Sequence, residues 1–215
     1  MSGRRQQSLM EILNSATIPE NPPDTVEELT LLRQCCLACS ACALRRGCKQ
    51  VVFDRGNPRA RIMLVGEGPG AEEDRLGVPF VGAAGRLLNR ILEAVELNED
   101  ALYVTNVVKC RPPGNRLPEP AEVERCLPYL KKQIELVNPD IIVCLGSLAA
   151  KTLVDRKSTI TSMRGRWIVL EGRHFMPTFH PAALLRDAGK KRPVWEDFQV
   201  IAQHYRSLHT GEGGV

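Results

Sequence analysis

The stretch that decides the fold is RIMLVGEGPG, residues 61–70. Its first half is an apolar run of strand length and its second half is a glycine-rich turn, a pattern typical of a buried strand that ends in a loop. Further apolar runs of strand length occupy residues 102–108, 140–145, 167–170 and 175–178. The chain is therefore expected to contain several buried strands, each leading into a loop or a turn.

Segments with the apolar spacing of a helix separate these strands. They occur at residues 87–95 and 123–137, and a final helix is expected at residues 194–208. Strands that alternate with helices favour a mostly parallel sheet with helices on both faces. We therefore expect a three-layer α/β/α fold with a central, mostly parallel four-stranded sheet. In such folds the binding site lies at the carboxyl ends of the strands.

The composition indicates one folded domain with an arm. The 215 residues are 43% hydrophobic, which is enough for one sizeable core. Residues 1–24 are polar and proline-containing, so we expect a flexible N-terminal arm there and a folded domain over residues 25–215. The N-terminus lacks the apolar core of a signal peptide, and no apolar run approaches the ~18 residues of a membrane span. We expect a cytoplasmic monomer without a membrane partner.

The charge and the arm indicate candidate partners. The net charge of +4 permits a weak contact with a polyanion such as DNA. Within the arm, Gln6, Leu9, Ile12 and Leu13 have the spacing of a peptide that binds a sliding clamp. The alternative is a short amphipathic turn that lies on the domain. A sliding clamp is therefore a candidate partner in addition to DNA.

Four of the eight cysteines have a spacing that indicates a metal centre. Cys39 and Cys42 form a CxxC pair, and Cys110 and Cys126 follow at the end of an expected strand and in the middle of an expected helix. Four thiolates can hold zinc or an iron–sulfur cluster. The second pair is too widely spaced for a zinc ribbon. Spacing alone therefore favours an iron–sulfur cluster, with zinc or unliganded buried cysteines as the alternatives.

The first pair of cysteines has a rival. Cys36 and Cys39 also form a CxxC, and Cys35 and Cys48 lie close by in the sequence. Cys144 lies inside an apolar strand and is expected to be a small buried side chain. The sequence thus indicates a metal centre more firmly than it indicates which cysteines form the first pair of its ligands.

The glycine turn admits a competing function. Gly66, Gly68 and Ala71 fit a relaxed dinucleotide-binding fingerprint, which would make the chain a nucleotide-binding iron–sulfur oxidoreductase. However, Glu67 lies inside the turn and three further carboxylates follow at residues 72–74. A pyrophosphate would meet these negative charges, whereas a neutral base would not be repelled.

The order and spacing of the motifs resemble those of the family 4, iron–sulfur-containing uracil-DNA glycosylases over about residues 31–208. These motifs are GEGPG (66–70), ED (73–74), PFVG (79–82), TN (105–106), KCRPPGNR (109–116) and HPAALLR (180–186). The resemblance implies that the protein flips uracil out of DNA and hydrolyses the N-glycosidic bond, leaving an abasic site for base excision repair. It also implies a four-iron, four-sulfur cluster on Cys39, Cys42, Cys110 and Cys126.

A non-turnover damage-binding protein is a third alternative. A related branch that traps uracil covalently carries a basic, histidine-bearing insertion after the second cluster motif, and no such insertion follows Cys110. No lysine is marked as a Schiff-base nucleophile near the motifs. Monofunctional turnover without a lyase step is therefore the expectation.

The expected uracil-binding residues come from four motifs. Asn106 has a carboxamide that can accept from uracil N3–H and donate to O4, although an asparagine that caps the strand end is the alternative. Phe80 would stack on the flipped ring, with core packing as the alternative. By resemblance, Glu73 narrows the pocket against a 5-methyl group, and Gly68 and Pro69 form part of the uracil-binding loop.

The expected catalytic residues are Glu67, His180 and Asn115. By resemblance, His180 hydrogen-bonds uracil O2 and stabilises the departing anion, a contact of the oxyanion-hole type. Glu67 would position or deprotonate the attacking water, and Asn115 would share that water. Leu184 is expected to intercalate into DNA, with Leu185 as the other candidate. Arg186, Lys190, Lys191 and Arg192 are available to phosphates.

Overall fold

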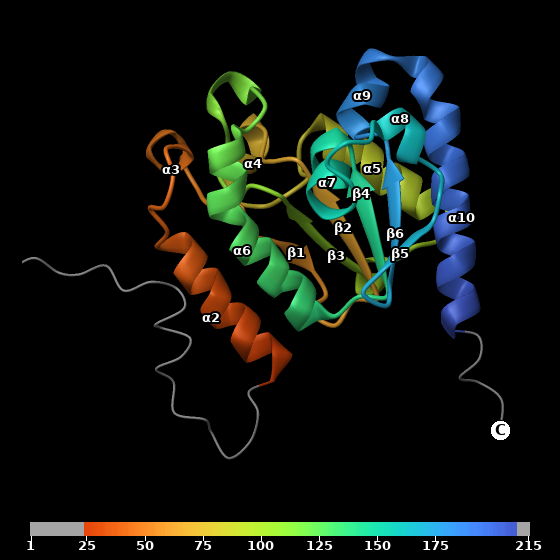
Figure 1. The fold of residues 1–215 in the computed structure, drawn as a ribbon, viewed down its shortest axis with the longest axis horizontal. Helices are drawn as coiled ribbons and strands as arrows, with labels where there is room; N and C mark the ends of the chain where they lie inside the picture. The colour runs from red at the N-terminus through yellow and green to blue at the C-terminus, as the bar shows by residue number, and fades with distance from the viewer. Residues whose placement is uncertain (1–23, 210–215) are drawn as a thin grey trace, which may run out of the picture.

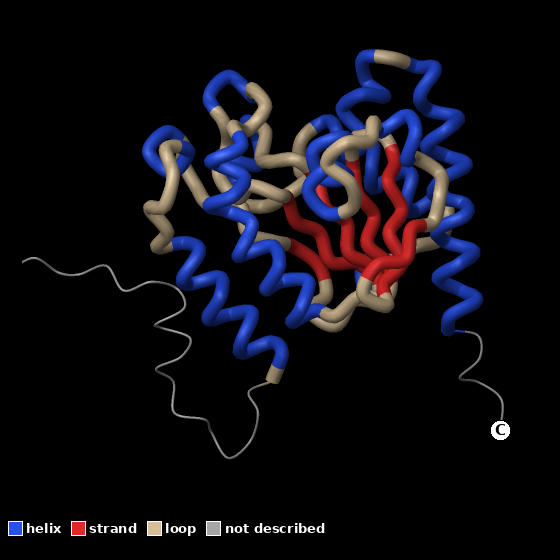
Figure 2. Tube along the Cα trace, in the orientation of Figure 1, coloured by secondary structure: helices blue, strands red, loops and turns tan. Residues whose placement is uncertain are grey.

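Four parallel strands form the centre of the sheet in a computed structural model that describes residues 24–209 (Figures 1 and 2). β2 (Ile62–Gly66) lies between β3 (Leu102–Asn106) and β4 (Ile141–Leu145), and β6 (Arg173–Thr178) follows β4. Every residue of β2, β3 and β4 is buried. Parallel strands are covered on both faces, which explains why their sequences are continuous apolar runs.

Two short antiparallel strands lie at the edges of this sheet. β1 (Arg55–Gly56) pairs with β3, and β5 (Ile168–Leu170) pairs with β6, so the strand order is β1-β3-β2-β4-β6-β5. The turn between β5 and β6 has positive φ angles at Glu171 (51°) and Gly172 (76°), the conformation of a tight hairpin. The predicted three-layer fold with a mostly parallel sheet is confirmed. The sheet has six strands where four were expected: β5 corresponds to the apolar run at residues 167–170, and β1 was not predicted.

Alternate residues of each strand enter two separate cores. Ile62 and Leu64 of β2 pack on one face with α5 (Ala83–Ala94) and α10 (Lys191–His209). Met63 and Val65 pack on the other face with α6 (Pro120–Val137) and α7 (Ser147–Leu153). Successive side chains of a strand point to opposite faces of the sheet. The continuous apolar runs therefore require helices on both sides.

Helix α2 (Thr25–Leu37) extends this second face by packing beside α6 (Figure 1). A third, smaller apolar cluster lies between them and includes Cys36, Phe53 and Tyr129. The remaining short elements are α3 (Leu44–Gly47), α4 (Ala71–Leu76), η1 (Glu99–Ala101), η2 (Pro113–Asn115), α8 (Ile160–Met163), α9 (Pro181–Arg186) and η3 (Ala188–Lys190).

Helix α6 begins where its sequence predicts. Pro120 occupies the first turn, where a missing N–H costs nothing. Glu119 and Glu122 form a reciprocal capping box, in which each side chain accepts from the other residue's backbone N–H. The helix ends at Asn138, whose left-handed conformation (φ 47°) stops the chain from continuing. This start fixes the direction of the loop that precedes α6.

The parallel arrangement brings three chemically unusual loops to one edge. The carboxyl ends of β2, β3 and β6 lead into the loops that begin at Glu67, Val107 and Phe179, and α4 and α9 lie at the same edge (Figure 1). In the part of the chain that the structure describes, no helix has the length and apolar character needed to cross a bilayer. Most of the expected arm, including the clamp-binding motif, lies outside the described residues, so the division at residue 24 stays a prediction.

Candidate active site

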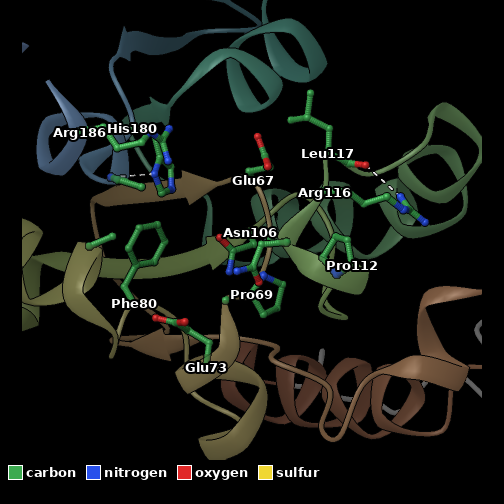
Figure 3. A pocket seen from close by; sticks show the side chains of 15 residues that line it. Glu67, Pro69, Glu73, Phe80, Asn106, Pro112, Arg116, Leu117, His180 and Arg186 are labelled. Carbon is green, nitrogen blue, oxygen red and sulfur yellow. Dashed lines mark hydrogen bonds between the residues drawn. The ribbon is translucent and has the colours of Figure 1, made fainter.

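A cavity of about 470 Å³ opens at the carboxyl edge of the sheet (Figure 3). Its walls come from segments that are far apart in the sequence. The residues expected to bind uracil or to act on it all line this cavity: Glu67, Gly68, Pro69, Glu73, Phe80, Asn106, Asn115 and His180. The fold therefore gathers into one site residues from the turn after β2, from α4, from the segment before α5, from the end of β3, from η2 and from the start of α9.

Asn106 and Phe80 meet over the end of β2. Asn106 is the last residue of β3 and lies opposite Gly66 in the parallel pairing. A Cβ atom on Gly66 would lie 2.4 Å from Asn106 Oδ1 and 2.6 Å from Phe80 Cζ. Contacts this short would force the amide and the ring apart, so only glycine allows this close approach. Both side chains are buried, and each has a face on the cavity.

The loop that carries Phe80 is held in an uncommon conformation. Phe80 has a φ of 56°, in the left-handed region that bulky residues rarely adopt. Glu73 secures the loop, because its Oε1 accepts hydrogen bonds from the N–H groups of Val81 (3.0 Å) and Gly82 (2.8 Å). Such strain costs of order 1–3 kcal/mol and persists where the surroundings impose it, often at functional sites. Glu73 thus positions Phe80 as well as lining the cavity.

His180 is held as a neutral donor. Its Nδ1 accepts a hydrogen bond from the N–H of Ala182 at 3.1 Å, so the proton of the neutral ring is on Nε2. Burial lowers the pKa of His180 to about 4, and the positive charge of Arg186 contributes to the same shift. At neutral pH the ring therefore presents an N–H to the cavity and carries no charge. The Phe80 ring lies 5.7 Å away, centroid to centroid.

Glu67 occupies the other wall of the cavity. Figure 3 shows Glu67 and Glu73 on opposite sides of Asn106. Burial raises the pKa of Glu67, whereas the positive charge of Arg186 opposes that rise. Arg186 therefore favours the ionised form of Glu67 and the neutral form of His180. Its effect on both groups was not foreseen, although its position six residues after His180, at the end of the helix that His180 caps, is a signal that sequence alone contains.

The loop after the cysteine at 110 closes the cavity. Asn115 has a φ of 56° and its Oδ1 accepts from Arg111 Nε at 2.8 Å, so its carboxamide is oriented by the loop itself. Arg116 makes two hydrogen bonds of 2.8 and 2.7 Å to the buried carboxylate of Glu122. Arg116 thereby anchors this loop to the start of α6. Leu117, which sequence reasoning missed, lines the same cavity and is highly exposed.

The two candidate intercalating leucines, Leu184 and Leu185, differ in their exposure to solvent. Leu184 has only 2% of its surface exposed and packs in the core with Leu88 and Phe198. Leu185, its neighbour on α9, is 53% exposed. Adjacent residues on a helix point about 100° apart, so only one of the two can face the solvent here. A side chain that enters DNA must leave the protein surface, and Leu185 is the leucine that meets this condition.

Five cysteines surround a second, very small cavity of about 20 Å³. They are Cys36, Cys39, Cys42, Cys110 and Cys126. Both expected pairs are thus brought together from three distant segments of the chain. The backbone N–H of Lys109 donates to Cys126 Sγ at 3.3 Å, and that of Ala41 donates to Cys39 Sγ at 3.5 Å. N–H groups directed at sulfur are the surroundings that a bound thiolate requires.

The donor chemistry of this cavity fits a thiolate-ligated metal centre. Cys35 does not line the cavity, and Cys48 is a neighbour of Cys110. Cys36 does line it, so the structure keeps the rival pair open. Cys144 is fully buried within β4, as expected. Within residues 24–209, no three His, Cys, Asp or Glu side chains are arranged to hold a single metal ion.

The fold and the two cavities define a class of protein. It is a three-layer α/β/α protein with a polar site at the carboxyl edge of its sheet and a cluster of cysteines beside that site. Residues 53–199 match the family model described as the uracil DNA glycosylase superfamily. That region contains the four parallel strands and all the residues named above that line the larger cavity, whereas Cys36, Cys39 and Cys42 precede it.

Several relatives resemble most of the chain. The type-4 uracil-DNA glycosylase of Thermotoga maritima is 47% identical over 75% of this chain and 86% of its own length. The type-4 enzyme of Sulfurisphaera tokodaii is 40% identical over 83% of this chain and 85% of its own length. That of Archaeoglobus fulgidus is 41% identical over 78% of this chain and 88% of its own length. The chain belongs to the uracil-DNA glycosylase superfamily and, within it, to the type-4 family. The resemblance inferred from the motifs is confirmed.

Proposed function

We propose that the protein is a monofunctional uracil-DNA glycosylase that flips uracil out of DNA and hydrolyses its N-glycosidic bond. The observation that carries this proposal is the single cavity that combines a buried amide, an aromatic ring and a neutral histidine N–H. A volume of about 470 Å³ is in the range of small-molecule sites. The family favours this function over a nucleotide-binding oxidoreductase.

Asn106 reads the base in this proposal. Its Oδ1 accepts from uracil N3–H and its Nδ2 donates to O4, a pairing that cytosine mismatches at both positions. Phe80 stacks on the ring, for which aromatic contacts contribute roughly 1–3 kcal/mol per base. Gly68 and Pro69 provide the backbone wall, and Glu73 narrows the space beside carbon 5 of the ring. Discrimination then comes from unpaired polar groups when the wrong base enters.

His180 stabilises the leaving group. The electron pair of the C1′–N1 bond departs with uracil, and negative charge develops on O2. The Nε2–H of His180 donates a hydrogen bond to that oxygen, and the neutral ring does not lose its proton to the product. One donor of this kind contributes about 3–4 kcal/mol to the transition state.

Glu67 directs the water. As a carboxylate it orients a water molecule toward C1′, accepts its proton as the new C–O bond forms, and stabilises the positive charge on the sugar. Asn115, held by Arg111, provides a second contact for that water. The products are an abasic deoxyribose and the uracil anion, which becomes free uracil when the proton held by Glu67 returns to it directly or through solvent.

The cysteine centre is assigned a structural role. Cys39, Cys42, Cys110 and Cys126 would hold a four-iron, four-sulfur cluster, which when bound cross-links the segment after α2, the loop after β3 and helix α6. Holding that loop also holds Asn115 and Arg116 at the cavity. On the DNA side, Leu185 takes the place of the flipped base, and Arg186 and the basic residues after it contact phosphates.

An alkaline cleavage assay tests the proposed function. The protein is incubated with a uracil-containing oligonucleotide and then with alkali, which cuts the strand only where a base has been removed. Cleavage at uracil and not at a matched thymine is expected. An intact strand from folded protein with its full iron content would contradict catalysis and favour a non-turnover damage-binding protein.

Two partner assignments remain proposals. We propose that the protein acts as a monomer and that residues 6–13 bind the sliding clamp through Gln6, Leu9, Ile12 and Leu13. Deletion of residues 1–23 is expected to abolish capture by the cognate clamp and to leave uracil excision unchanged. Equal capture by the deleted and full-length proteins would contradict the clamp assignment.

A further inference from the structure

Lys109 is buried beneath the active site, with 1% of its surface exposed. Its ammonium donates three hydrogen bonds of 2.6 Å each, to Thr105 Oγ1, to the Asn106 carbonyl oxygen and to Gln133 Oε1. A lysine ammonium has three N–H donors, so all of them are used. The Phe53 ring lies 5.9 Å from the Nζ atom.

The acceptors of Lys109 belong to a buried polar network. Gln133 Nε2 donates to Tyr103 Oη at 2.8 Å, and Tyr103 Oη donates to Asp54 Oδ2 at 2.5 Å. None of the groups that accept directly from Lys109 is a carboxylate. Burying a charge on neutral acceptors is costly, and an apolar side chain of similar volume is often at least as stable in such a position. The placement of this lysine therefore points to a role beyond stability.

Lys109 links Asn106, the proposed base reader, to the cysteine cavity, and the two residues between Asn106 and Lys109 bond to the glycine turn after β2. Its side chain holds the Asn106 carbonyl, and its backbone N–H donates to Cys126 Sγ. The two residues between them bond to the glycine turn, through Val107 N–H to the Gly66 carbonyl (2.9 Å) and Val108 N–H to the Glu67 carbonyl (3.1 Å). The turn after β3 is thus held by the Lys109 side chain, by Cys126 and by the backbone of the glycine turn.

The Asn106 carboxamide depends on this backbone for its direction. Within the described residues, its side chain makes no hydrogen bond, and its Oδ1 lies against Gly66 on the side where the Phe80 ring also approaches that glycine. An amide that reads a base must point both its oxygen and its nitrogen correctly, because a displacement of about 1 Å is enough to cost a large part of the rate. What orients the carboxamide is therefore the peptide that Lys109 holds.

We propose that Lys109 is a positioning residue for base selection, which orients the Asn106 carboxamide by holding the Asn106 carbonyl. The inference rests on the proposed role of Asn106 as the base reader. Its consequence is that removing the ammonium impairs the chemical step and the recognition of uracil O4, and leaves DNA affinity and metal content largely unchanged.

The test compares Lys109→Met with a matched surface variant, Lys151→Met. Lys151 is exposed on α7 and lines neither cavity. Four quantities are measured: the single-turnover excision rate, the affinity for DNA containing an uncleavable uracil nucleotide, the iron content and the melting temperature. Excision of 4-thiouracil is measured in parallel, because sulfur at position 4 is a poor acceptor for the Asn106 Nδ2–H.

Lys109→Met is expected to slow uracil excision by roughly 10- to 100-fold, with DNA affinity within threefold of the parent protein. The ratio of uracil to 4-thiouracil rates is expected to fall at least threefold relative to the parent, because a misdirected amide no longer distinguishes the two atoms. Lys151→Met is expected to change none of these quantities. An unchanged rate ratio in folded Lys109→Met protein with full iron content would overturn the proposal, whatever happens to the melting temperature.

Two further variants keep the test decisive. If Lys109→Met does not fold, Thr105→Val removes one acceptor of the ammonium without a change of shape, and the same fall in rate ratio is expected to a smaller extent. An unchanged ratio there overturns the proposal.

Asn106→Ala separates the failure of the base-reading role of Asn106 from the failure of the positioning role of Lys109. If it excises uracil normally, the base-reading role fails together with this proposal; if it loses excision while Lys109→Met keeps the parent ratio, only the role of Lys109 fails.

Discussion

His180 illustrates how a single backbone contact determines the chemistry of a side chain. The N–H of Ala182 occupies Nδ1, so the neutral ring carries its proton on Nε2. The pKa falls from the ordinary 6.5 to about 4, so between these values the unfolded chain binds more protons than the folded one. The stability contributed by neutral His180 is therefore present above pH 6.5 and is lost as the pH falls toward 4.

His180→Ala is expected to slow excision by roughly 10²–10³-fold, with a smaller effect on DNA affinity, because the hydrogen bond strengthens as charge develops on uracil. Single-turnover rates and binding to uncleavable DNA separate the two effects. His174→Ala is the control, because His174 lies in β6, away from the cavity. Equal losses of rate and affinity would assign His180 to ground-state binding instead.

Arg186→Met is expected to move the acid limb of the excision rate to higher pH. The arginine lowers the pKa values of both Glu67 and His180, so its removal raises both. Each group then takes up its proton at a higher pH, and both changes reduce activity as the pH falls. Single-turnover rates from pH 4 to 8 provide the measurement, with Arg90, which is exposed on α5 and does not line the cavity, replaced by Met as the control. An acid limb that stays in place would exclude electrostatic control by Arg186.

Asn106→Asp is expected to abolish most uracil excision. An ionised carboxylate can only accept hydrogen bonds, and it would face uracil O4, which is also an acceptor. Any activity on cytosine is expected to be weak and to increase at lower pH, where the carboxyl group can donate. Excision of both bases from matched oligonucleotides is compared across pH. Uracil excision within about tenfold of the parent, or about 1.4 kcal/mol, would show that Asn106 is not the base reader.

At the scale of elements, α9 places two adjacent leucines in different environments. Leu184 faces the core and Leu185 faces the solvent beside the cavity. The helix begins at Pro181 and is capped by His180, so its rotation is fixed by the same residue that acts in the site. The assignment of a DNA-contacting side chain therefore depends on the orientation of a six-residue helix.

Leu185→Ala is expected to slow excision from duplex DNA by about tenfold and to change excision from single strands little, because only a duplex must be opened to extrude the base. Leu184→Ala is expected to lower the free energy of unfolding by roughly 2–5 kcal/mol, as for other buried leucines. Excision from both substrates and chemical denaturation are measured for each variant. A larger duplex-specific loss in stable Leu184→Ala protein would reverse the assignment.

At the scale of the whole molecule, the cysteine cavity joins three segments that are separate in sequence. Cys110→Ser and Cys126→Ser are expected to lose the metal centre and much of the stability, whereas Cys35→Ser keeps both, because metal binding is coupled to folding. Iron content and melting temperature are compared across the three variants. Full iron content in Cys126→Ser would contradict the proposed ligand set, and loss of iron in Cys36→Ser would favour the rival pair.

Local patterns in the sequence predicted the layers of the fold and the edge at which the site lies, and the resemblance to the glycosylase family predicted most of the residues that line the cavity. Continuous apolar runs predict strands covered on both faces, and parallel strands bring the loops that carry Glu67, Asn106 and His180 to one edge. Periodicity contains this information because it records which faces of an element are buried. The antiparallel edges β1 and β5 add strands without altering that edge.

Tertiary structure alone decided which of two similar residues is buried and which is exposed. Leu184 and Leu185 are identical in local pattern, yet only their packing against α5 and the solvent distinguishes them. The burial of Lys109 depends on Gln133 from α6, and the proton position of His180 depends on one backbone N–H. Such properties arise from contacts between distant segments or from exact backbone direction, neither of which the spacing of residue types records.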